Sequence, residues 1–318
     1  MEEQKVWDVV IVGGGAAGMS AAIYTCRKKM STVVVTVDVG GQNLLTESEE
    51  NYPGYLEMSG PKLMNMFQEQ AVKFGSDFVF GKAVKLEKEG DLFKVTMGNG
   101  ETYVSKIVIL GYGKVARELG VPGEKKFLGR GVHTCATCDA PFTKGKTVAV
   151  AGGGNSALEA AELLSKFATK VYLIHRRDEF RADPITVDKI KAIPNVELVL
   201  STEIREVLGE QKVRGILVED AKTGVKREIE LNSVFIEIGY ILDSAWLGGL
   251  VKTNEIGEVV INDRCETSQP GIFAAGDVTN TPYKQTVISA GEGAKAGLSA
   301  YNYMRVKEGK VAIKQDWG

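Results

Sequence analysis

The chain contains the stretch VVIVGGGAAG at residues 9–18, and a second copy, VAVAGGGNSA, follows at residues 148–157. Each copy is a short apolar run, typical of a buried parallel strand, followed by a glycine loop and an alanine-rich helical stretch. A second apolar run follows each helical stretch, at residues 32–37 and 170–174, and completes a βαβ unit. The fingerprint positions, 139 residues apart in each pair, are Gly13, Gly15 and Gly18 in the first copy and Gly152, Gly154 and Ala157 in the second. The sequence therefore predicts an α/β protein with two Rossmann-like dinucleotide-binding domains.

Three later apolar runs indicate how the chain passes between the two domains. The run at residues 108–110 ends in a glycine-rich segment, and the runs at 234–239 and 271–277 resemble each other, so one could close each domain. We therefore expect the second domain to be inserted into the first, with two crossings around residues 111–120 and 239–243. The expected boundaries are residues 1–115 for the first segment of the first domain, 116–243 for the inserted domain and 244–318 for the second segment of the first domain.

The composition is that of an ordinary globular protein, with 44% apolar and 25% charged residues among 318. The 39 lysines and arginines are balanced by 41 acidic residues, so no basic field is available to bind nucleic acid or anionic lipid. The N-terminal residues lack a basic segment followed by an apolar stretch, and no run approaches the roughly 18 apolar residues of a membrane span. The presence of only four cysteines argues against a secreted disulfide scaffold. We expect a cytoplasmic protein that binds neither nucleic acid nor membrane.

The first fingerprint predicts a dinucleotide site. Its glycines would supply a tight turn, a bare backbone against a pyrophosphate and close packing of helix on strand, with the helix N-terminus facing the phosphates. Asp38 lies 20 residues beyond Gly18, where a carboxylate that binds a ribose hydroxyl is expected. Because Asp38 falls slightly past the apparent end of its strand, a solvated loop position is the alternative.

The second fingerprint is followed by a basic segment, HRRDEFR, at residues 175–181. Where an NAD site would present an acid to the ribose, this segment presents arginines, whose planar guanidinium groups suit a 2′-phosphate. NADPH is therefore favoured over NADH, and the alternative is a solvated basic face. His175 is expected to be structural or adjacent to a phosphate rather than a base. The predicted NADPH-binding residues beside the fingerprint are Asn155, Ser156, His175, Arg176, Arg177 and Arg181.

Between the two fingerprints lies CATCD at residues 135–139, a Cys-X-X-Cys pair followed by an acid. Two thiols at this spacing can close a disulfide with little backbone movement, and thioredoxin-type pairs have depressed thiol pKa values. A zinc site would need further ligands nearby, whereas Cys26 and Cys265 are more than 100 residues away, so we expect no metal and two inert thiols. Thiol exchange requires a proton donor for the leaving thiolate. Asp139 is the predicted donor, and His133 is the alternative.

Five motifs, in order along nearly the whole chain, resemble those of the low-molecular-weight thioredoxin reductases, the class II pyridine nucleotide-disulfide oxidoreductases. They are GGQ at 40–42, ENYPG at 50–54, CATCD at 135–139, HRRDEFR at 175–181 and GIFAAGD at 271–277. The resemblance implies FAD in the first domain, NADPH in the inserted domain and a homodimer. It also implies contacts to the flavin ring and ribityl chain, and a helix from Lys284 through Ala300 at the pyrimidine edge of the flavin. The residues implied to bind FAD, besides the first fingerprint and Asp38, are Gly41, Gln42, Asn51, Asp277, Gln285 and Thr286.

The resemblance also implies a reaction. Electrons would pass from NADPH through FAD to the Cys135–Cys138 disulfide and then to a disulfide of thioredoxin or a thioredoxin-like protein. Cys138 would face the flavin and Cys135 would be its exchange partner. Arg130 and Phe142 match the partner-contacting positions of the family, and a buried core role is the alternative for Phe142. Because the thiols and the nicotinamide would occupy one domain yet must reach the same flavin, we expect that domain to rotate about the two crossings. Two departures from the family pattern are Tyr112, where a threonine is usual, and Ala140, where a glycine is frequent.

Two other functions stay open at this point. The same electron path could end at a glutaredoxin-like protein or a peroxidase system, although we expect the chain to lack the extra N-terminal module of flavoprotein peroxidase reductases. A non-catalytic nucleotide-binding or zinc-stabilised scaffold is the alternative from another class. A yellow protein that is bleached by NADPH and free of zinc would eliminate the scaffold.

Overall fold

The structure is a computed structural model that describes residues 5–46 and 49–313. The chain forms two compact units. The first unit contains residues 1–44, 52–114 and 242–318, and the second contains residues 45–51 and 115–241. The chain passes from the first unit to the second after Lys114 and returns at Leu242. The segment 45–51, which the sequence led us to expect in the first domain, is grouped with the second unit. Its residue Leu45 lies so close to Gly129 that an added Cβ there would approach the Leu45 carbonyl oxygen to 3.2 Å.

The first unit is built on a mixed sheet centred on β1 and β6. Parallel strands lie in the order β3-β2-β1-β6, and β6 then pairs with two different strands. Residues 102–105 of β6 pair with the hairpin β4-β5, and residues 108–110 pair with the parallel strand β17. The strands are β1 Val6–Gly14, β2 Thr32–Val39, β3 Asp77–Phe80, β4 Ala83–Glu89, β5 Leu92–Met97, β6 Thr102–Leu110 and β17 Ile272–Ala274.

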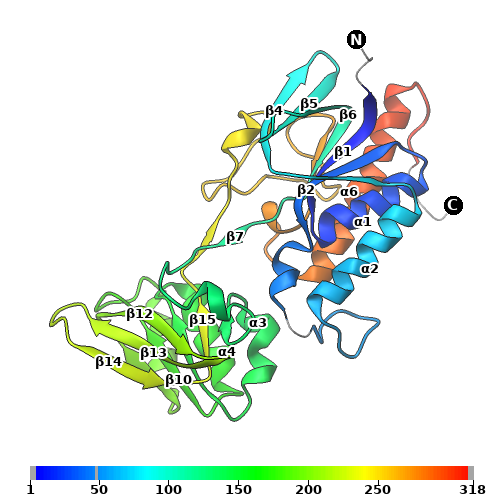
Figure 1. The fold of residues 1–318 in the computed structure, drawn as a ribbon. Coiled ribbons are helices and arrows are strands. Elements are labelled where there is room, and N and C mark those ends of the chain that lie inside the picture. Colours follow the sequence, from blue (N-terminus) through cyan, green and yellow to red (C-terminus); the bar gives the residue numbers. More distant parts are fainter. Residues whose placement is uncertain (1–4, 47–48, 314–318) are drawn as a thin grey trace. The chain divides into compact units, whose positions relative to one another are not determined.

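The two faces of this sheet bury alternate residues of the same strands. Val9 and Ile11 pack toward the helices, whereas Val10 and Val12 pack toward the β4-β5 hairpin and the segment around Trp246. Burial of each such side chain contributes roughly 1.5–3 kcal/mol. The three helices lie together on one side of the strands, as Figure 1 shows. They are α1 Ala16–Arg27, α2 Gly60–Lys73 and α6 Thr286–Lys307.

The second unit repeats the parallel part of this plan. Its strands lie in the order β11-β10-β9-β15-β8, and all neighbours are parallel. By position, β9 corresponds to β1, β15 to β6 and β8 to β17. The run at 234–239 is therefore the counterpart of β6, because the chain enters this unit through its edge strand β8. The runs at 234–239 and 271–277 each supply the last strand of the main sheet of their unit, as the sequence suggested. The strands are β8 Val132–His133, β9 Thr147–Ala151, β10 Lys170–Ile174, β11 Val196–Val199 and β15 Ser233–Ile236.

Two smaller sheets complete the second unit. An antiparallel meander, β12 Thr202–Gly209, β13 Val213–Asp220 and β14 Lys226–Glu230, packs on one face of the parallel sheet. The crossings pair with each other as β7 Val115–Ala116 and β16 Tyr240–Ile241, which form an antiparallel ribbon. The helices are α3 Ala136–Asp139, α4 Asn155–Ser165 and α5 Pro184–Lys191.

Short 3-10 helices connect several of these elements. They are η1 Gly41–Leu45, η2 Lys125–Phe127, η3 Ala140–Thr143, η4 Ala245–Leu247 and η5 Gly276–Val278. Within the part of the chain that the structure describes, no helix combines the length and the apolar character required to cross a bilayer. The α/β architecture with two Rossmann-like units, predicted from the repeated glycine stretch, is confirmed.

Candidate functional site

The first glycine loop joins β1 to α1 and has one open position between two tightly packed ones. Gly13 has φ +114°, and a Cβ there would lie 2.3 Å from the carbonyl oxygen of Gly111. A Cβ on Gly18 would lie 1.8 Å from the carbonyl oxygen of Gly13. A Cβ on Gly15, the N-cap of α1, would meet nothing closer than 4.0 Å. The bare backbone of Gly15 therefore adjoins open space at a helix N-terminus, which is where a pyrophosphate group fits.

The second glycine loop, between β9 and α4, repeats this arrangement. Gly152 has φ +156°, and a Cβ there would lie 2.3 Å from the carbonyl oxygen of Glu237. Gly154 is the N-cap of α4, and a Cβ added to it would meet no atom within 4 Å. The third position is Ala157, whose Cβ lies where a side chain on Gly152 would have to go, at 2.6 Å. Both loops therefore present an open backbone that fits a dinucleotide.

Asp38 lies within β2, which extends to Val39 and is longer than the sequence suggested. The loop position considered as an alternative for Asp38 is therefore wrong. Its side chain is half-buried, and its Oδ1 accepts a hydrogen bond from the backbone N–H of Gly41 at 2.7 Å. Because β2 runs parallel to β1, this carboxylate lies at the same sheet edge as the first glycine loop. Ribose binding by Asp38 stays a prediction.

Two further predicted FAD-binding residues make hydrogen bonds within the first unit. Gln42 donates through Nε2 to the carbonyl oxygen of Lys114 at 3.3 Å. Thr286, the first residue of α6, donates through Oγ1 to Oδ1 of Asn43 at 2.8 Å, and Gln285 is the N-cap of the same helix. The helix begins two residues after the expected start and continues to Lys307.

Asp277 lies in η5, close to the N-terminal half of α6. Its carboxyl is half-buried, and Ser289 donates a hydrogen bond to Oδ1 at 3.4 Å. Burial raises the pKa of Asp277, while the charges of Lys114 and Lys284 oppose that rise. Asn51, the other predicted contact, belongs to the segment that is grouped with the second unit.

Glu292 is a buried carboxylate that was not predicted from the sequence. Glu292 is 6% exposed, and its carboxylate accepts hydrogen bonds from the backbone N–H of Gly276 at 2.7 Å and from the hydroxyl of Thr281. It therefore fastens the loop that carries Asp277 to α6. The available signal was a lone glutamate flanked by Gly291 and Gly293 in an alanine- and glycine-rich stretch, where an ordinary surface glutamate is out of place.

Tyr112, which stands where the resemblance suggests a threonine, follows the carbonyl that packs on Gly13. Its ring lies 5.3 Å from the ring of Trp246, at an interplanar angle of 69°. Among the described residues, its buried hydroxyl has no hydrogen-bond partner. Burial, with a smaller effect from the charge of Asp243, raises the pKa of the phenol, so Tyr112 is neutral. Its ring therefore packs as an apolar group between Trp246 and the first glycine loop.

The basic segment after β10 is held against the second glycine loop. The backbone N–H of Arg181 donates to the carbonyl oxygen of Gly153 at 2.8 Å. The side chains of Arg176, Arg177 and Arg181 are exposed, and within residues 5–46 and 49–313 their guanidinium groups have no acidic partner. Of the two acids in the segment, Asp178 is paired instead with Lys222 at 3.0 Å, and Glu179 is exposed. Three guanidinium groups without an ion-pair partner among the described residues therefore follow the strand next to the open loop.

His175 lies directly against the same loop. A Cβ on Gly153 would approach its imidazole ring to 2.3 Å, and the ring stacks on Phe180 at 5.6 Å and 18°. The residue is 5% exposed. Burial lowers the pKa of His175, and the charges of the three arginines lower it further, so the imidazole is neutral at neutral pH. The ring therefore supports the loop by packing.

Asn155 and Ser156, at the start of α4, are both exposed. Asn155 accepts a hydrogen bond from the backbone N–H of Asp183 at 2.8 Å and donates one to its carboxylate at 3.1 Å. These two bonds link the start of α4 to the start of α5, so the Asn155 side chain is already engaged by the protein.

The cysteine pair follows β8 and forms the expected disulfide, with a Cα–Cα distance of 5.4 Å. Cys135 is the N-cap of the single-turn helix α3, and its Sγ accepts a hydrogen bond from the backbone N–H of Cys138 at 3.3 Å. Because β8, β15 and β9 are adjacent and parallel, Cys135 and Gly152 both follow carboxyl ends of strands at one edge of the sheet. Ligands of open α/β sheets bind at this edge.

The two candidate proton donors are hydrogen-bonded to each other. Nδ1 of His133 lies 2.9 Å from Oδ2 of Asp139, and the two side chains are 15% and 8% exposed. The single turn of α3 brings Asp139 back to the end of β8, where His133 is the last strand residue. The imidazole ring stacks on Phe235 of β15 at 4.8 Å and 20°. From the sequence these residues were alternatives, and nothing in it indicated their contact.

The two remaining cysteines are buried and reduced. Burial raises the pKa of the Cys26 thiol, and it raises that of Cys265 to about 12. Both therefore stay protonated at neutral pH and are poor nucleophiles.

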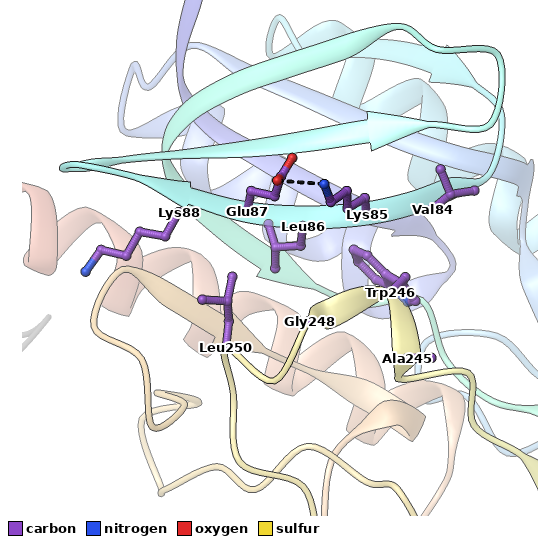
Figure 2. A pocket seen from close by; sticks show the side chains of 9 residues that line it. All are labelled: Val84, Lys85, Leu86, Glu87, Lys88, Ala245, Trp246, Gly248 and Leu250. Atoms are coloured by element: carbon purple, nitrogen blue, oxygen red, sulfur yellow. Dashed lines mark ion pairs between the residues drawn. The ribbon is translucent and has the colours of Figure 1, made fainter.

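A separate pocket of about 490 Å³ lies in the first unit between β4 and the segment around η4, as Figure 2 shows. Its polar rim contains the ion pair between Lys85 and Glu87, at 2.7 Å. Trp246 lines the pocket and also contacts Tyr112. Because the pocket contains no fingerprint residue and no cysteine, it is distinct from the dinucleotide and disulfide sites.

Known proteins resemble this chain over most of its length. The family described as Pyridine nucleotide-disulphide oxidoreductase matches residues 7–294. A thioredoxin reductase of Bacillus subtilis (strain 168) is 40% identical over 306 residues, which cover 96% of each protein. An alkyl hydroperoxide reductase component of Pseudomonas putida is 42% identical, but the chain spans only 59% of its length. The crystal structure of thioredoxin reductase from Streptococcus pyogenes MGAS5005 has a TM-score of 0.91 at 37% identity, covering 96% of this chain and all of that one.

The matched residues include both glycine loops and the disulfide. Membership of the matched family implies a pyridine nucleotide and a flavin, for which the two open loops offer sites. The chain therefore belongs to the pyridine nucleotide-disulphide oxidoreductase family, within which it groups with the low-molecular-weight thioredoxin reductases.

Proposed function

We propose that the chain is an NADPH-dependent thioredoxin-disulfide reductase, in which electrons pass from NADPH through FAD to the Cys135–Cys138 disulfide and on to a disulfide of a protein partner. The observation that carries the proposal is the shared sheet edge of the second unit. There β8 leads to the cysteine pair and β9 to a dinucleotide loop. Matches over nearly the full length of proteins named thioredoxin reductase support the same reaction.

We assign FAD to the first unit and NADPH to the second. When bound, the flavin would supply the two-electron chemistry that connects the nicotinamide with the disulfide. The residues proposed to hold FAD are Gly13, Gly15, Gly18, Asp38, Gly41, Gln42, Asn51, Asp277, Gln285 and Thr286. Those proposed to hold NADPH are Gly152, Gly154, Asn155, Ser156, Ala157, His175, Arg176, Arg177 and Arg181.

Specificity for the 2′-phosphate is assigned to the arginines after β10. Their guanidinium groups have no acidic partner among the described residues, and a phosphate ester would provide one. His175, neutral and buried, would hold the glycine loop and this segment together by packing, and it would not add a positive charge to the phosphate site. The side chain of Asn155 would act mainly through the link to Asp183.

The chain's own chemistry is thiol–disulfide exchange. We assign Cys138 to the flavin side and Cys135 to the exchange with the partner, since the N–H of Cys138 directed at Cys135 Sγ would stabilise a thiolate there. Asp139 would protonate the thiolate that leaves the partner. Arg130, which is exposed, and Phe142, which is half-exposed, flank the disulfide and would contact the partner.

A peroxidase-type partner is the second candidate. It is supported by the 42% identity to the alkyl hydroperoxide reductase component of Pseudomonas putida, which the chain matches over part of its length. The electron path and the site residues would be the same, and only the protein that receives the electrons would differ.

Four further assignments go with this function. The residues 1–115, 116–243 and 244–318 would act as an FAD domain divided by an NADPH domain. The inserted domain would rotate about the paired crossings so that thiols and nicotinamide reach the flavin in turn. The protein would work as a homodimer, and it would be cytoplasmic.

The test reconstitutes the purified chain with FAD and follows the flavin absorbance during titration with NADPH and, separately, with NADH. We expect bleaching at lower concentrations of NADPH, followed by reduction of thioredoxin when that protein is added. Cys138→Ser should slow thioredoxin reduction by on the order of 10³-fold or more, because one thiol cannot complete the exchange. Cys26→Ala, which removes a buried thiol, is the matched control and should turn over normally.

Three outcomes would contradict parts of the proposal. Normal turnover of Cys138→Ser would remove the disulfide from the electron path. Reduction of a peroxidase but not of thioredoxin would favour the second candidate. Failure to bind any flavin would return the chain to the class of nucleotide-binding scaffolds.

A further inference from the structure

We propose that His133 is a positioning residue for Asp139, and that the two side chains together hold the proton that is exchanged when the cysteine pair reacts with a disulfide. The inference rests on the proposed function, since it concerns the reaction of that pair. It adds a residue to the exchange chemistry and replaces two alternative acids by one bonded pair.

The geometry that carries the proposal is the contact between His133 and Asp139, in which the neighbouring structure fixes both side chains. Nδ1 of His133 lies 2.9 Å from Oδ2 of Asp139. The ring of His133 stacks on Phe235, its partner in the register of β8 with β15. Asp139 is the last residue of α3, so the disulfide turn sets its position. The backbone N–H of Asp139 donates to the carbonyl oxygen of Cys135 at 3.2 Å, so the carboxylate belongs to the same turn as both sulfurs.

A bonded pair supplies what a lone carboxyl would not. In water an aspartic acid side chain titrates near pH 3.9, whereas an imidazole titrates near pH 6.5, to about half a unit. A lone aspartate has no proton to donate at neutral pH. In the bonded pair a carboxylate oxygen and a ring nitrogen share one hydrogen bond, and the stacked ring holds the carboxyl in one orientation. His133 therefore positions Asp139 and its proton beside the cysteine pair.

The proton and electrons balance as follows. The Cys135 thiolate attacks the substrate disulfide, so that a new S–S bond forms, the substrate S–S bond breaks and the leaving thiolate takes a proton from the pair. Cys138 then returns its thiol proton to the pair and attacks the sulfur of Cys135. The Cys135–Cys138 bond re-forms and the second substrate thiolate departs, to be protonated by water. Two electrons have moved to the substrate, and the pair holds the proton with which it began.

Other titratable groups surround the pair. On its own segment these are the two cysteines. From the neighbouring strand, Glu237 follows β15 two residues beyond Phe235, and Tyr240 donates a hydrogen bond to the carbonyl oxygen of Thr134 at 3.1 Å. The helix α4 contributes apolar residues, Leu158 and Ala161, to the core under α3. Of these groups, His133 is the one that the structure describes in side-chain contact with the Asp139 carboxylate, at 2.9 Å.

The test uses the purified full chain, reduced and desalted without oxygen, and two small disulfides. Bis(2-hydroxyethyl) disulfide releases a strongly basic thiolate, which needs a proton to leave. An aryl disulfide such as 5,5′-dithiobis(2-nitrobenzoate) releases a weakly basic thiolate, which needs none. We expect His133→Asn to slow the first reaction about tenfold at pH 7.5 and the second less than about twofold.

The matched variant is Asp139→Asn, which should show the same selective loss. The double variant should then be no slower than Asp139→Asn alone, because both changes remove one unit. Equal slowing with both disulfides, or effects that multiply in the double variant, would overturn the proposal. Circular dichroism checks folding, and His133→Phe, which keeps the stacking on Phe235, replaces His133→Asn if the latter does not fold. If the reconstituted wild type failed to reduce thioredoxin, the proposed function would fall, yet these small-disulfide rates would still decide the role of His133.

Discussion

The two glycine loops have nearly the same backbone but different neighbours. In each loop the first glycine has a positive φ and packs on a carbonyl of the adjacent strand, that of Gly111 in the first unit and of Glu237 in the second. In each loop the middle glycine adjoins open space. The segments after the second strand differ, with a carboxylate in one unit and arginines in the other. The loop backbone thus suits the pyrophosphate, which both dinucleotides contain. The residues at the end of the next strand differ between the units and would distinguish the two nucleotides.

The helices that begin at these loops also differ in their surroundings. In the first unit α6 packs closely on α1, and a Cβ added to Gly293 would lie 2.0 Å from the carbonyl oxygen of Ala17. In the second unit α4 keeps an exposed face, which carries Asn155, Ser156 and Glu159. The first loop is therefore embedded in its core more deeply than the second, and changes there should affect folding most.

The largest effect is expected from Gly13→Ala. Because φ is +114° and the new Cβ would clash with the Gly111 carbonyl, the substitution should destabilise the first unit by about 3 kcal/mol. Urea unfolding followed by tryptophan fluorescence measures this, since Trp7 and Trp246 both lie in the first unit. Gly15→Ala is the control in the same loop and should leave the unfolding midpoint of the FAD-free chain unchanged while weakening FAD retention. Identical unfolding curves for the two variants would show that the loop is not held as described.

An intermediate effect is expected from the arginines of the second loop. Replacing Arg176, Arg177 and Arg181 together by glutamine should raise the KM for NADPH by roughly 30-fold and that for NADH by less than about twofold. Steady-state kinetics with both nucleotides measures the difference. Lys222→Gln, which removes a neighbouring positive charge paired with Asp178, is the control. If both nucleotides were affected equally, the segment would be a solvated basic face.

The smallest effect is expected from His175 and appears only as a pH dependence. Burial lowers the pKa of His175 in the folded state, so the unfolded chain binds more protons and stability falls as the pH drops below about 6.5. Hydrogen exchange of residues 170–199, compared at pH 7 and pH 5, measures this loss. His175→Asn should exchange at rates that depend less on pH. A wild-type profile that matches this variant would remove the buried imidazole as the cause.

Patterns local in the chain predicted most of the fold. The apolar runs, glycine loops and helical stretches indicated both βαβ units, because each depends on a few adjacent residues. The two late apolar runs close the main sheets of their units, but their places in the strand order differ, since β15 takes the place of β6. Strand order depends on the strand at which the chain enters a sheet, and a sequence pattern within one segment does not predict that strand. Glu292 was missed because its partners Gly276 and Thr281 lie outside its helix, on the loop that precedes α6.

The site shows the same division. Spacing was enough to identify the Cys135–Cys138 disulfide, since its two sulfurs are held by one turn of backbone. Sequence also pointed to both open glycine loops and to the basic segment, which are continuous stretches. Tertiary structure alone decided that His133 and Asp139 are partners and that the disulfide shares a sheet edge with the second loop. Those relations come from the pairing of β8, β15 and β9, strands that are separated by as many as 100 residues. Pairing over such distances is determined by the packing of the whole unit, and no single segment specifies it.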